Sequence, residues 1–183
     1  MKSFVAIIAG EPNSINSEII AKAWKLKKNK KRNLFIIGNY SLLKKQISKL
    51  GISIPLIKIN KLQDFKKERK LFILNVPLKF KSIFNVNTSD VKIYIFKCFD
   101  IAHNLAKKKQ IVGFINLPID KKIFANKYLG VTEYLSFKNK CKNKEVMMIY
   151  NKKLSVTPLT THIEIKNVTN KITFNLIKAK IIT

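Results

Sequence analysis

The chain has 183 residues, which suits one domain or one domain with part of another, and 46% of them are hydrophobic, enough to build a core. It contains no uninterrupted apolar run of about 18 residues, which argues against a membrane-spanning helix. The formal net charge of +27, taken alone, would indicate a polyanion such as nucleic acid as a partner.

The type and distribution of the basic residues point away from that partner. Almost all of them are lysine, because Arg32 and Arg69 are the only arginines, and arginine is the residue that forms paired hydrogen bonds with phosphates and guanines. The lysines are spread along the whole chain, and no segment gathers basic and aromatic residues. We interpret the charge as a compositional bias on a solvated surface, with weak non-specific binding to nucleic acid expected at low salt.

Apolar, β-branched runs alternate with lysine-rich amphipathic stretches along the chain. The first run, Phe4–Ala9, is short enough for a signal-peptide core, but Gly10-Glu11-Pro12 follow it where small cleavage-site residues should lie, so we interpret it as a buried strand. In chain order we then expect a helix at 17–28, a strand at 34–37, a helix at 41–50, strands at 57–59 and 71–75, a helix at 90–109, strands at 111–115, 146–150 and 155–159, and a helix at 168–182. Gly51 follows the second helix where a C-cap glycine belongs.

This alternation predicts an α/β layer fold with a largely parallel sheet. In such sheets ligands bind beyond the carboxyl ends of the strands, so the loops after the strands are the candidate sites. The first, Gly10–Ile19, has a glycine for a sharp turn and Asn and Ser side chains that can cap a helix. It lacks the second and third glycines of a dinucleotide fingerprint and also fits an ordinary strand-to-helix turn.

Three further motifs follow later in the chain. In Gly113–Lys122, Asn116, Asp120 and Lys121 would meet a ligand at a strand end, or Pro118 and Asp120 would only make a turn. In Gly130–Ser136, Thr132 and Glu133 stand at a helix start, where the threonine would contact a ligand or only cap the helix. Met147-Met148 precede the last motif, Leu159–Ile165, which contains Thr160-Thr161-His162.

Few residues offer metal or redox chemistry. Cys98 and Cys141 have no metal-ligand spacing, and we expect reduced thiols in a cytoplasmic protein. His162 is a candidate metal ligand with Glu164 near it, whereas His103 lies in an amphipathic helix and is interpreted as structural. A lone histidine is more often structural than a ligand, and a metal site at His162 would need at least two further protein ligands.

The order and spacing of these motifs resemble the 4-hydroxythreonine-4-phosphate dehydrogenase family. Its G-[DE]-P-A-G-I-G-P-E loop is kept at Gly10-Glu11-Pro12, Ile15 and Glu18, with departures at Asn13, Ser14, Asn16 and Ser17. Its T-[AG]-P-[IV]-[NH]-K segment corresponds to residues 116–121, and its G-H-T-E-[FY]-L segment to residues 130–135. Its M-M strand and A-T-T-H-[LI]-P-L segment correspond to residues 147–148 and 159–165.

The resemblance implies an isopropylmalate-dehydrogenase-like fold of α/β/α layers in two lobes. Residues 1–125 would form the first α/β lobe, and residues 126–183 the beginning of a second, metal- and substrate-binding lobe. Family chains are nearly twice as long, so the second lobe is expected to be incomplete, with the strands at 146–150 and 155–159 lacking neighbours. The family is a cytoplasmic homodimer with its active site at the interface, so a homodimer is expected here.

The implied activity is the NAD- or NADP-dependent oxidation, with decarboxylation, of 4-phosphooxy-L-threonine in pyridoxal phosphate biosynthesis. A divalent metal (Zn, Mg or Co) would polarise the substrate, and the resemblance makes His162 one of its ligands. Thr132 would contact the substrate, and Val131 replaces the family's substrate-contacting histidine. The resemblance leaves catalytic and cofactor residues in this chain unassigned.

We expect this chain to be an enzyme polypeptide of this family, either one piece of a split enzyme or a fragment of a longer one. Its expected partners are a second copy in a homodimer and, for a split enzyme, a separate C-terminal chain. Two alternatives stay open. One is a degenerate remnant that catalyses nothing, and the other is a basic module that binds nucleic acid.

Overall fold

The computed structural model describes residues 4–26, 33–66, 68–124, 127–141, 144–161 and 163–183. The chain forms two compact units, Met1–Asp120 and Lys121–Thr183. These units are defined by the contacts within this chain. The lobes at 1–125 and 126–183 come from the family resemblance, and they stay a prediction.

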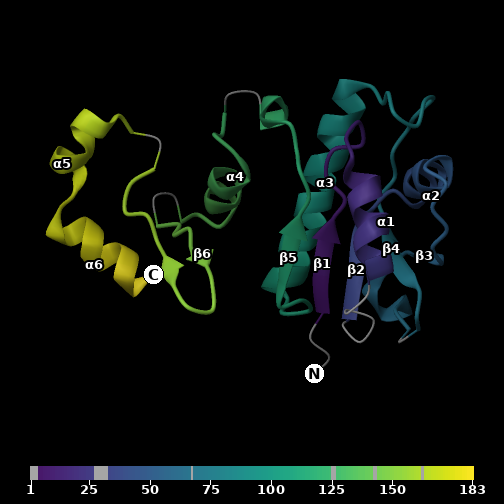
Figure 1. Ribbon diagram of the computed structural model, residues 1–183, viewed down its shortest axis with the longest axis horizontal. Coiled ribbons are helices and arrows are strands. Elements are labelled where there is room, and N and C mark those ends of the chain that lie inside the picture. The colour runs from purple at the N-terminus through teal and green to yellow at the C-terminus, as the bar shows by residue number, and fades with distance from the viewer. Residues whose placement is uncertain (1–3, 27–32, 67, 125–126, 142–143, 162) are drawn as a thin grey trace. The chain divides into compact units, whose positions relative to one another are not determined.

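The first unit is built on a parallel sheet of short apolar strands, drawn in Figure 1. The strands are β1 (Phe4–Ile8), β2 (Asn33–Gly38), β3 (Leu56–Ile59), β4 (Leu71–Asn75) and β5 (Gly113–Asn116). Their order across the sheet is β3-β4-β2-β1-β5, and every neighbouring pair is parallel. The α/β fold with a parallel sheet that the sequence predicts is therefore confirmed.

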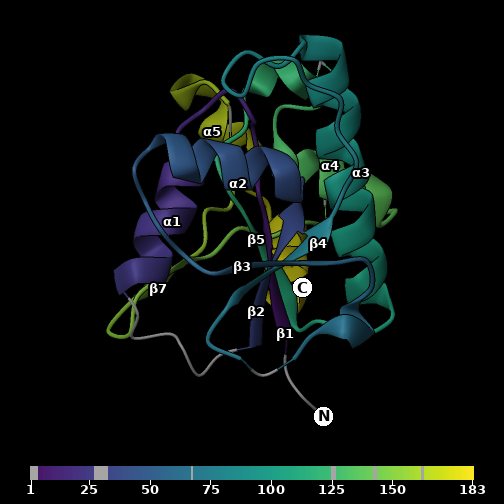
Figure 2. The ribbon, with the colours of Figure 1, turned by 90° about the vertical axis from the view of Figure 1, so that its right-hand side faces the viewer.

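Helices cover both faces of this sheet. They are α1 (Asn16–Leu26), α2 (Tyr40–Lys49) and α3 (Thr88–Lys107), with a short 3-10 turn, η1 (Leu62–Asp64). Figure 2 shows α1 and α2 on one face and α3 on the other. The central strands are buried on both faces, as parallel sheets require, and Ile36 of β2 and Ile73 of β4 are at most 1% exposed. No described helix combines the length and apolar character needed to cross a membrane.

Both ends of α2 are capped, and the C-terminal cap is the one that the sequence indicates. At the start, Asn39 Oδ1 accepts a hydrogen bond from Leu42 N at 2.9 Å. At the end, Gly51 has φ +67° and donates to Ser48 O, while Ile52 N donates to Ile47 O. This Schellman arrangement confirms Gly51 as the residue that ends the helix.

Asn39 also makes hydrogen bonds to two segments beyond its own helix. Its Nδ2 donates to Val76 O at 2.9 Å, in the segment that follows β4. Its backbone N donates to the Tyr94 hydroxyl of α3, also at 2.9 Å. Because Asn39 is only 6% exposed, these bonds have no water to replace them.

The second unit contains shorter elements. They are the 3-10 turn η2 (Lys121–Phe124), α4 (Val131–Lys138), β6 (Ile149–Tyr150), β7 (Ser155–Val156), the 3-10 turn η3 (Ile165–Asn167), α5 (Val168–Lys171) and α6 (Phe174–Ile182). The strands expected at 146–150 and 155–159 are reduced to a two-residue antiparallel ladder between β6 and β7.

The single helix expected at 168–182 is wrong, because the chain leaves the helical region between α5 and α6. Ile172 and Thr173 are both extended, and Thr173 Oγ1 accepts a hydrogen bond from Leu176 N at 3.2 Å. Threonine is a strong N-cap residue and a poor helix former, so a new helix starts here although the apolar spacing continues across the break.

We predict that Asn39→Ala lowers the free energy of unfolding of the first unit by about 2–4 kcal/mol, since it removes a cap and leaves a buried carbonyl without its donor. Trp24, the sole tryptophan, lies in this unit and its fluorescence reports urea unfolding. The matched control is Asn87→Ala, because Asn87 caps α3 from an exposed position with a single backbone bond to Ser89 N. Asn87→Ala is expected to cost about 1 kcal/mol, and equal costs for both variants would contradict the cross-linking role of Asn39.

Candidate functional site

The first candidate site lies at the carboxyl ends of β1 and β5. The strand β1 pairs with β2 on one side and with β5 on the other, so the order of the sheet reverses beside it. Such a switch point is where open α/β sheets bind ligands. The loops that follow β1 and β5 are the first two motifs that the sequence singles out.

The two loops are joined by hydrogen bonds to one carbonyl. Pro118 O accepts from Glu11 N at 3.1 Å and from Asn16 Nδ2 at 2.8 Å. Gly10 permits this approach, because its φ is +71° and a Cβ there would lie 2.5 Å from Asn16 Nδ2 and 2.7 Å from Pro118 O. The sequence places both loops at strand ends, and the structure brings them together.

Amide side chains bind the same loop to its other neighbours. Asn13 Nδ2 donates to Val86 O at 2.9 Å, and Val86 N donates back to Asn13 Oδ1 at 2.7 Å. Gln46 of α2 is 2% exposed and donates to Pro12 O at 2.8 Å. Asn13 and Asn16 are departures from the family loop, so side-chain amides make structural hydrogen bonds at positions where the family has Ala and Gly. Sequence reasoning missed these partners because Asn13 and Val86 are 73 residues apart.

The junction carries two unusual polar groups. Partial burial raises the pKa of the Glu11 carboxyl, a hydrogen bond from Asn13 N lowers it, and the charge of Asp120 raises it. Asn16 Oδ1 is buried and accepts no hydrogen bond from the described residues. Both groups favour a neighbour that donates hydrogen bonds. Asn116, by contrast, is exposed, and its Nδ2 donates to Leu117 O at 3.5 Å.

The second candidate site is a pocket of about 220 Å³ within the second unit. It gathers residues from three of the sequence motifs. Its lining residues are Lys121, Leu129, Gly130, Val131, Thr132, Glu133, Glu145, Met147, Pro158, Leu159, Thr161 and Lys180.

Val131 and Thr132 reach this pocket because of how α4 begins and packs. The N-cap is Gly130, which makes no side-chain cap, so the interpretation of Thr132 as a helix cap is wrong and its hydroxyl is not used there. On the buried side, the Tyr134 ring lies 5.9 Å from that of Phe124 and 5.4 Å from that of Tyr128. Tyr134 therefore holds the buried face of the helix, while Thr132 is exposed.

Glu145 connects the two ends of the second unit beside the pocket. Its Oε2 accepts a hydrogen bond from Ser136 Oγ of α4 at 2.7 Å. Its backbone O accepts from Lys180 Nζ of α6. Sequence reasoning did not single out Glu145 or Lys180, since nothing distinguishes one lysine in a lysine-rich chain from the others.

The predicted metal ligand, His162, lies outside the described residues. Thr161, the residue before it, lines the pocket together with the predicted substrate residues Val131 and Thr132. Among the described residues, no group of three His, Cys, Asp or Glu side chains is placed to hold a metal ion.

Comparisons of the amino-acid sequence with known proteins find relatives of this chain. A family profile described as "Pyridoxal phosphate biosynthetic protein PdxA" matches residues 30–183. The curated 4-hydroxythreonine-4-phosphate dehydrogenase of Wigglesworthia glossinidia brevipalpis is 29% identical, covering 98% of this chain and 55% of the relative. That of Hydrogenobaculum sp. is 31% identical, covering 99% of this chain and 57% of the relative. The chain thus spans about half the length of the curated relatives it matches.

A solved structure shows the same fold. It is a putative 4-hydroxythreonine-4-phosphate dehydrogenase from Salmonella typhimurium, with a TM-score of 0.86 and 21% identity over 99% of this chain and 57% of that one. The likeness confirms the isopropylmalate-dehydrogenase-like α/β architecture expected from the sequence.

We predict that Gly10→Ala destabilises the first unit by about 2–5 kcal/mol, because it adds the strain of a positive φ to a clash with Pro118 O and Asn16. Gly51→Ala is the matched control, since Gly51 has φ +67° but nothing within 4 Å of its Cβ position. It should cost only about 1–2 kcal/mol. Urea unfolding followed by Trp24 fluorescence measures both, and a Gly10→Ala cost no larger than that of Gly51→Ala would refute the close junction of the two loops.

Proposed function

The chain belongs to the PdxA family of pyridoxal phosphate biosynthetic proteins, and from this we propose that it supplies the N-terminal half of a 4-hydroxythreonine-4-phosphate dehydrogenase. The reaction would be the oxidation of 4-phosphooxy-L-threonine by NAD or NADP, followed by decarboxylation. Within it, the second unit would bind and orient the phosphorylated substrate.

The observation that carries this proposal is the composition of the 220 Å³ pocket. Lys121, Thr132 and Thr161 come from three separate motifs that the chain shares in order with the family, and all three line this one pocket. If the three motifs resembled those of the family only by chance, there would be no reason for their residues to line the same pocket.

The chemistry of these side chains suits a small phosphorylated amino acid. Lys121 brings an ammonium group, a point charge that attracts phosphate or carboxylate. The Thr132 and Thr161 hydroxyls both donate and accept hydrogen bonds, as a substrate hydroxyl requires. Val131 offers only an apolar wall where the family has a histidine, so this chain makes one fewer polar contact with the substrate.

The cofactor and the metal need residues beyond those described. The loop after β1 is no cradle for a dinucleotide pyrophosphate, because Asn16 and Pro118 fill the space beside Gly10. We propose His162 as a ligand of a divalent metal, but the described residues supply no three-ligand group. The described part of the chain is therefore suited to substrate binding and orientation.

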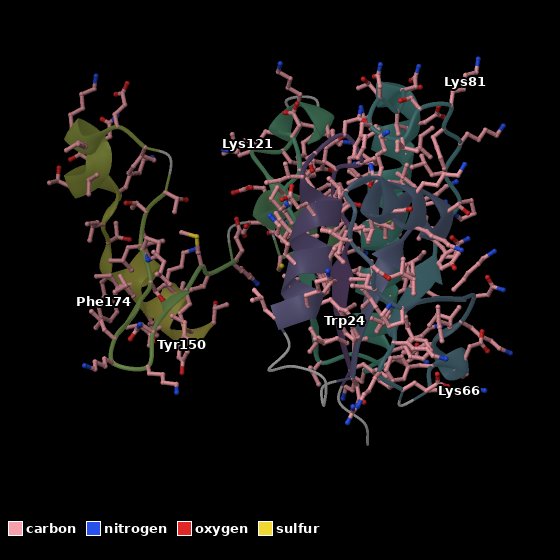
Figure 3. The ribbon with its side chains drawn as sticks, turned by 45° about the vertical axis from the view of Figure 1, so that its right-hand side comes forward. Trp24, Lys66, Lys81, Lys121, Tyr150 and Phe174 are labelled. Atoms are coloured by element: carbon pink, nitrogen blue, oxygen red, sulfur yellow. The ribbon has the colours of Figure 1, made fainter. Side chains whose placement is uncertain are left out.

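Exposed apolar side chains of the second unit support association with a partner, as in the homodimer expected from the family. Tyr150 and Phe174, labelled in Figure 3, are 73% and 77% exposed, and Ile165 is 90% exposed. Several strongly exposed large apolar side chains on one unit are typical of a surface that another chain covers. We propose that a second copy, or a separate C-terminal chain, covers these exposed apolar side chains of the second unit.

The proposed function is tested by a turnover assay. The chain, alone and mixed with the C-terminal half of the Hydrogenobaculum relative, is given 4-phosphooxy-L-threonine, NAD or NADP, and a divalent metal. We expect reduced nicotinamide from the mixture and its loss in His162→Ala. Thr132→Val should lower kcat/KM about 10-fold, the cost of one hydrogen bond.

A gain-of-function variant makes the assay sharper. Val131→His adds back the imidazole of the family and should raise kcat/KM about 10-fold if this pocket binds the substrate. The control is Val112→His, at a 70% exposed position of the first unit, which should change nothing. Failure of a folded chain to give turnover, with and without the added half, would contradict the proposal.

A further inference from the structure

Two segments far apart in the sequence form one basic surface on the first unit. They are α2 (Tyr40–Lys49) and residues 79–87, which lie between β4 and α3. Gln46 Nε2 fastens them together by donating to Ile83 O at 2.6 Å. Asn13 fixes the far end of residues 79–87 through its two hydrogen bonds with Val86.

This surface is shallow, open to solvent and strongly positive. One hollow of about 740 Å³ lies along α2, and another of about 580 Å³ lies along residues 79–87. Five lysines and one acid, Asp90, line them, and we call this surface the lysine groove. The lysines are Lys44, Lys45, Lys49, Lys79 and Lys81.

Figure 3 shows Lys81 extending from the ribbon of the first unit toward solvent. The other four lysines are exposed as well. Their ammonium groups are therefore accessible to a ligand.

Aromatic rings lie between these charges. Lys44 Nζ is 5.9 Å from the centre of the Tyr40 ring, and Lys45 Nζ is 5.4 Å from the centre of the Phe80 ring. The second contact also joins the two hollows, because Lys45 lines one and Phe80 lines the other. The ammonium groups of Lys44 and Lys45 thus each lie beside an aromatic ring.

We propose that the lysine groove binds single-stranded nucleic acid. Lysines along a groove neutralise successive phosphates, and aromatic rings beside them stack with the bases, which is how sequence-tolerant single-strand binding works. The helix α2 is roughly 15 Å long, enough to follow several nucleotides. A membrane surface fits less well, because binding to a membrane needs exposed apolar side chains. Within α2 and residues 79–87, Phe84 is the one large apolar residue that is exposed.

The competing explanation is the net charge of +27, which would attract any polyanion to any face. A charge-matched comparison separates the two. The groove variant is Lys44→Glu, Lys45→Glu and Lys49→Glu combined. The control variant is Lys92→Glu, Lys97→Glu and Lys107→Glu combined, at exposed positions of α3 on the opposite face of the sheet.

Binding of a fluorescein-labelled oligothymidine is measured by anisotropy over a series of salt concentrations. Trp24 fluorescence confirms that each variant is folded. We expect the groove variant to raise the dissociation constant at least 10-fold and the control variant less than 3-fold. Three lost phosphate contacts should also reduce the slope of log affinity against log salt by about 2, since each contact on a single strand contributes about 0.7.

A third variant tests the aromatic contribution. Phe80→Ala should weaken binding about 5-fold or more, because stacking of one base is lost, while the salt slope stays unchanged. Equal weakening by the groove and control variants would overturn the proposal in favour of diffuse attraction. So would binding to vesicles of anionic lipid without binding to the oligonucleotide.

Discussion

Side-chain amides hold together the carboxyl edge of the five-stranded sheet, and the arrangement of the first unit depends on them. Irregular segments that follow buried strands carry backbone carbonyls and N–H groups that need partners. Asn16 supplies a donor to Pro118 O, Asn39 to Val76 O, and Gln46 to both Pro12 O and Ile83 O. In the other direction, Asn75 Oδ1 accepts from Tyr40 N at 3.0 Å. These bonds determine where the loops after β1, β2, β4 and β5 lie, and they also set residues 79–87 against α2.

The second unit relies instead on the packing of aromatic rings around one helix. Tyr134 and Ser136 of α4 are 6% and 4% exposed, and they fix which side of the helix is turned inward. Val131 and Thr132 are consequently left at the pocket, together with Lys121 and Thr161. The substrate role proposed for this chain follows from that orientation, while the family membership follows independently from the match over residues 30–183.

The sequence predicts the parts of the fold that depend on local patterns. Strand β4 is found at the expected residues 71–75, and Gly51 ends α2 as its position indicates. Local patterns could not show the break at Thr173, where a capping hydroxyl outweighs continued apolar spacing. They also could not show the lysine groove, whose two halves contact each other through Gln46 and Ile83, which are 37 residues apart in the chain, and through Lys45 and Phe80. The first two motifs were placed at strand ends correctly, as the ends of β1 and β5 show, but which motif residues share a pocket depends on packing.

The most direct test of the central claim, that the second unit holds the substrate pocket, is a titration of the isotope-labelled chain with 4-phosphooxy-L-threonine followed by amide NMR shifts. Our account predicts saturable shifts concentrated at Gly130–Glu133, Lys121 and Thr161. It also predicts that the Val131→His variant binds the substrate more tightly, so that these shifts saturate at a lower substrate concentration. Shifts confined to the lysines of α2, or spread over the whole surface without saturation, would show that only the phosphate charge is recognised and would contradict the account.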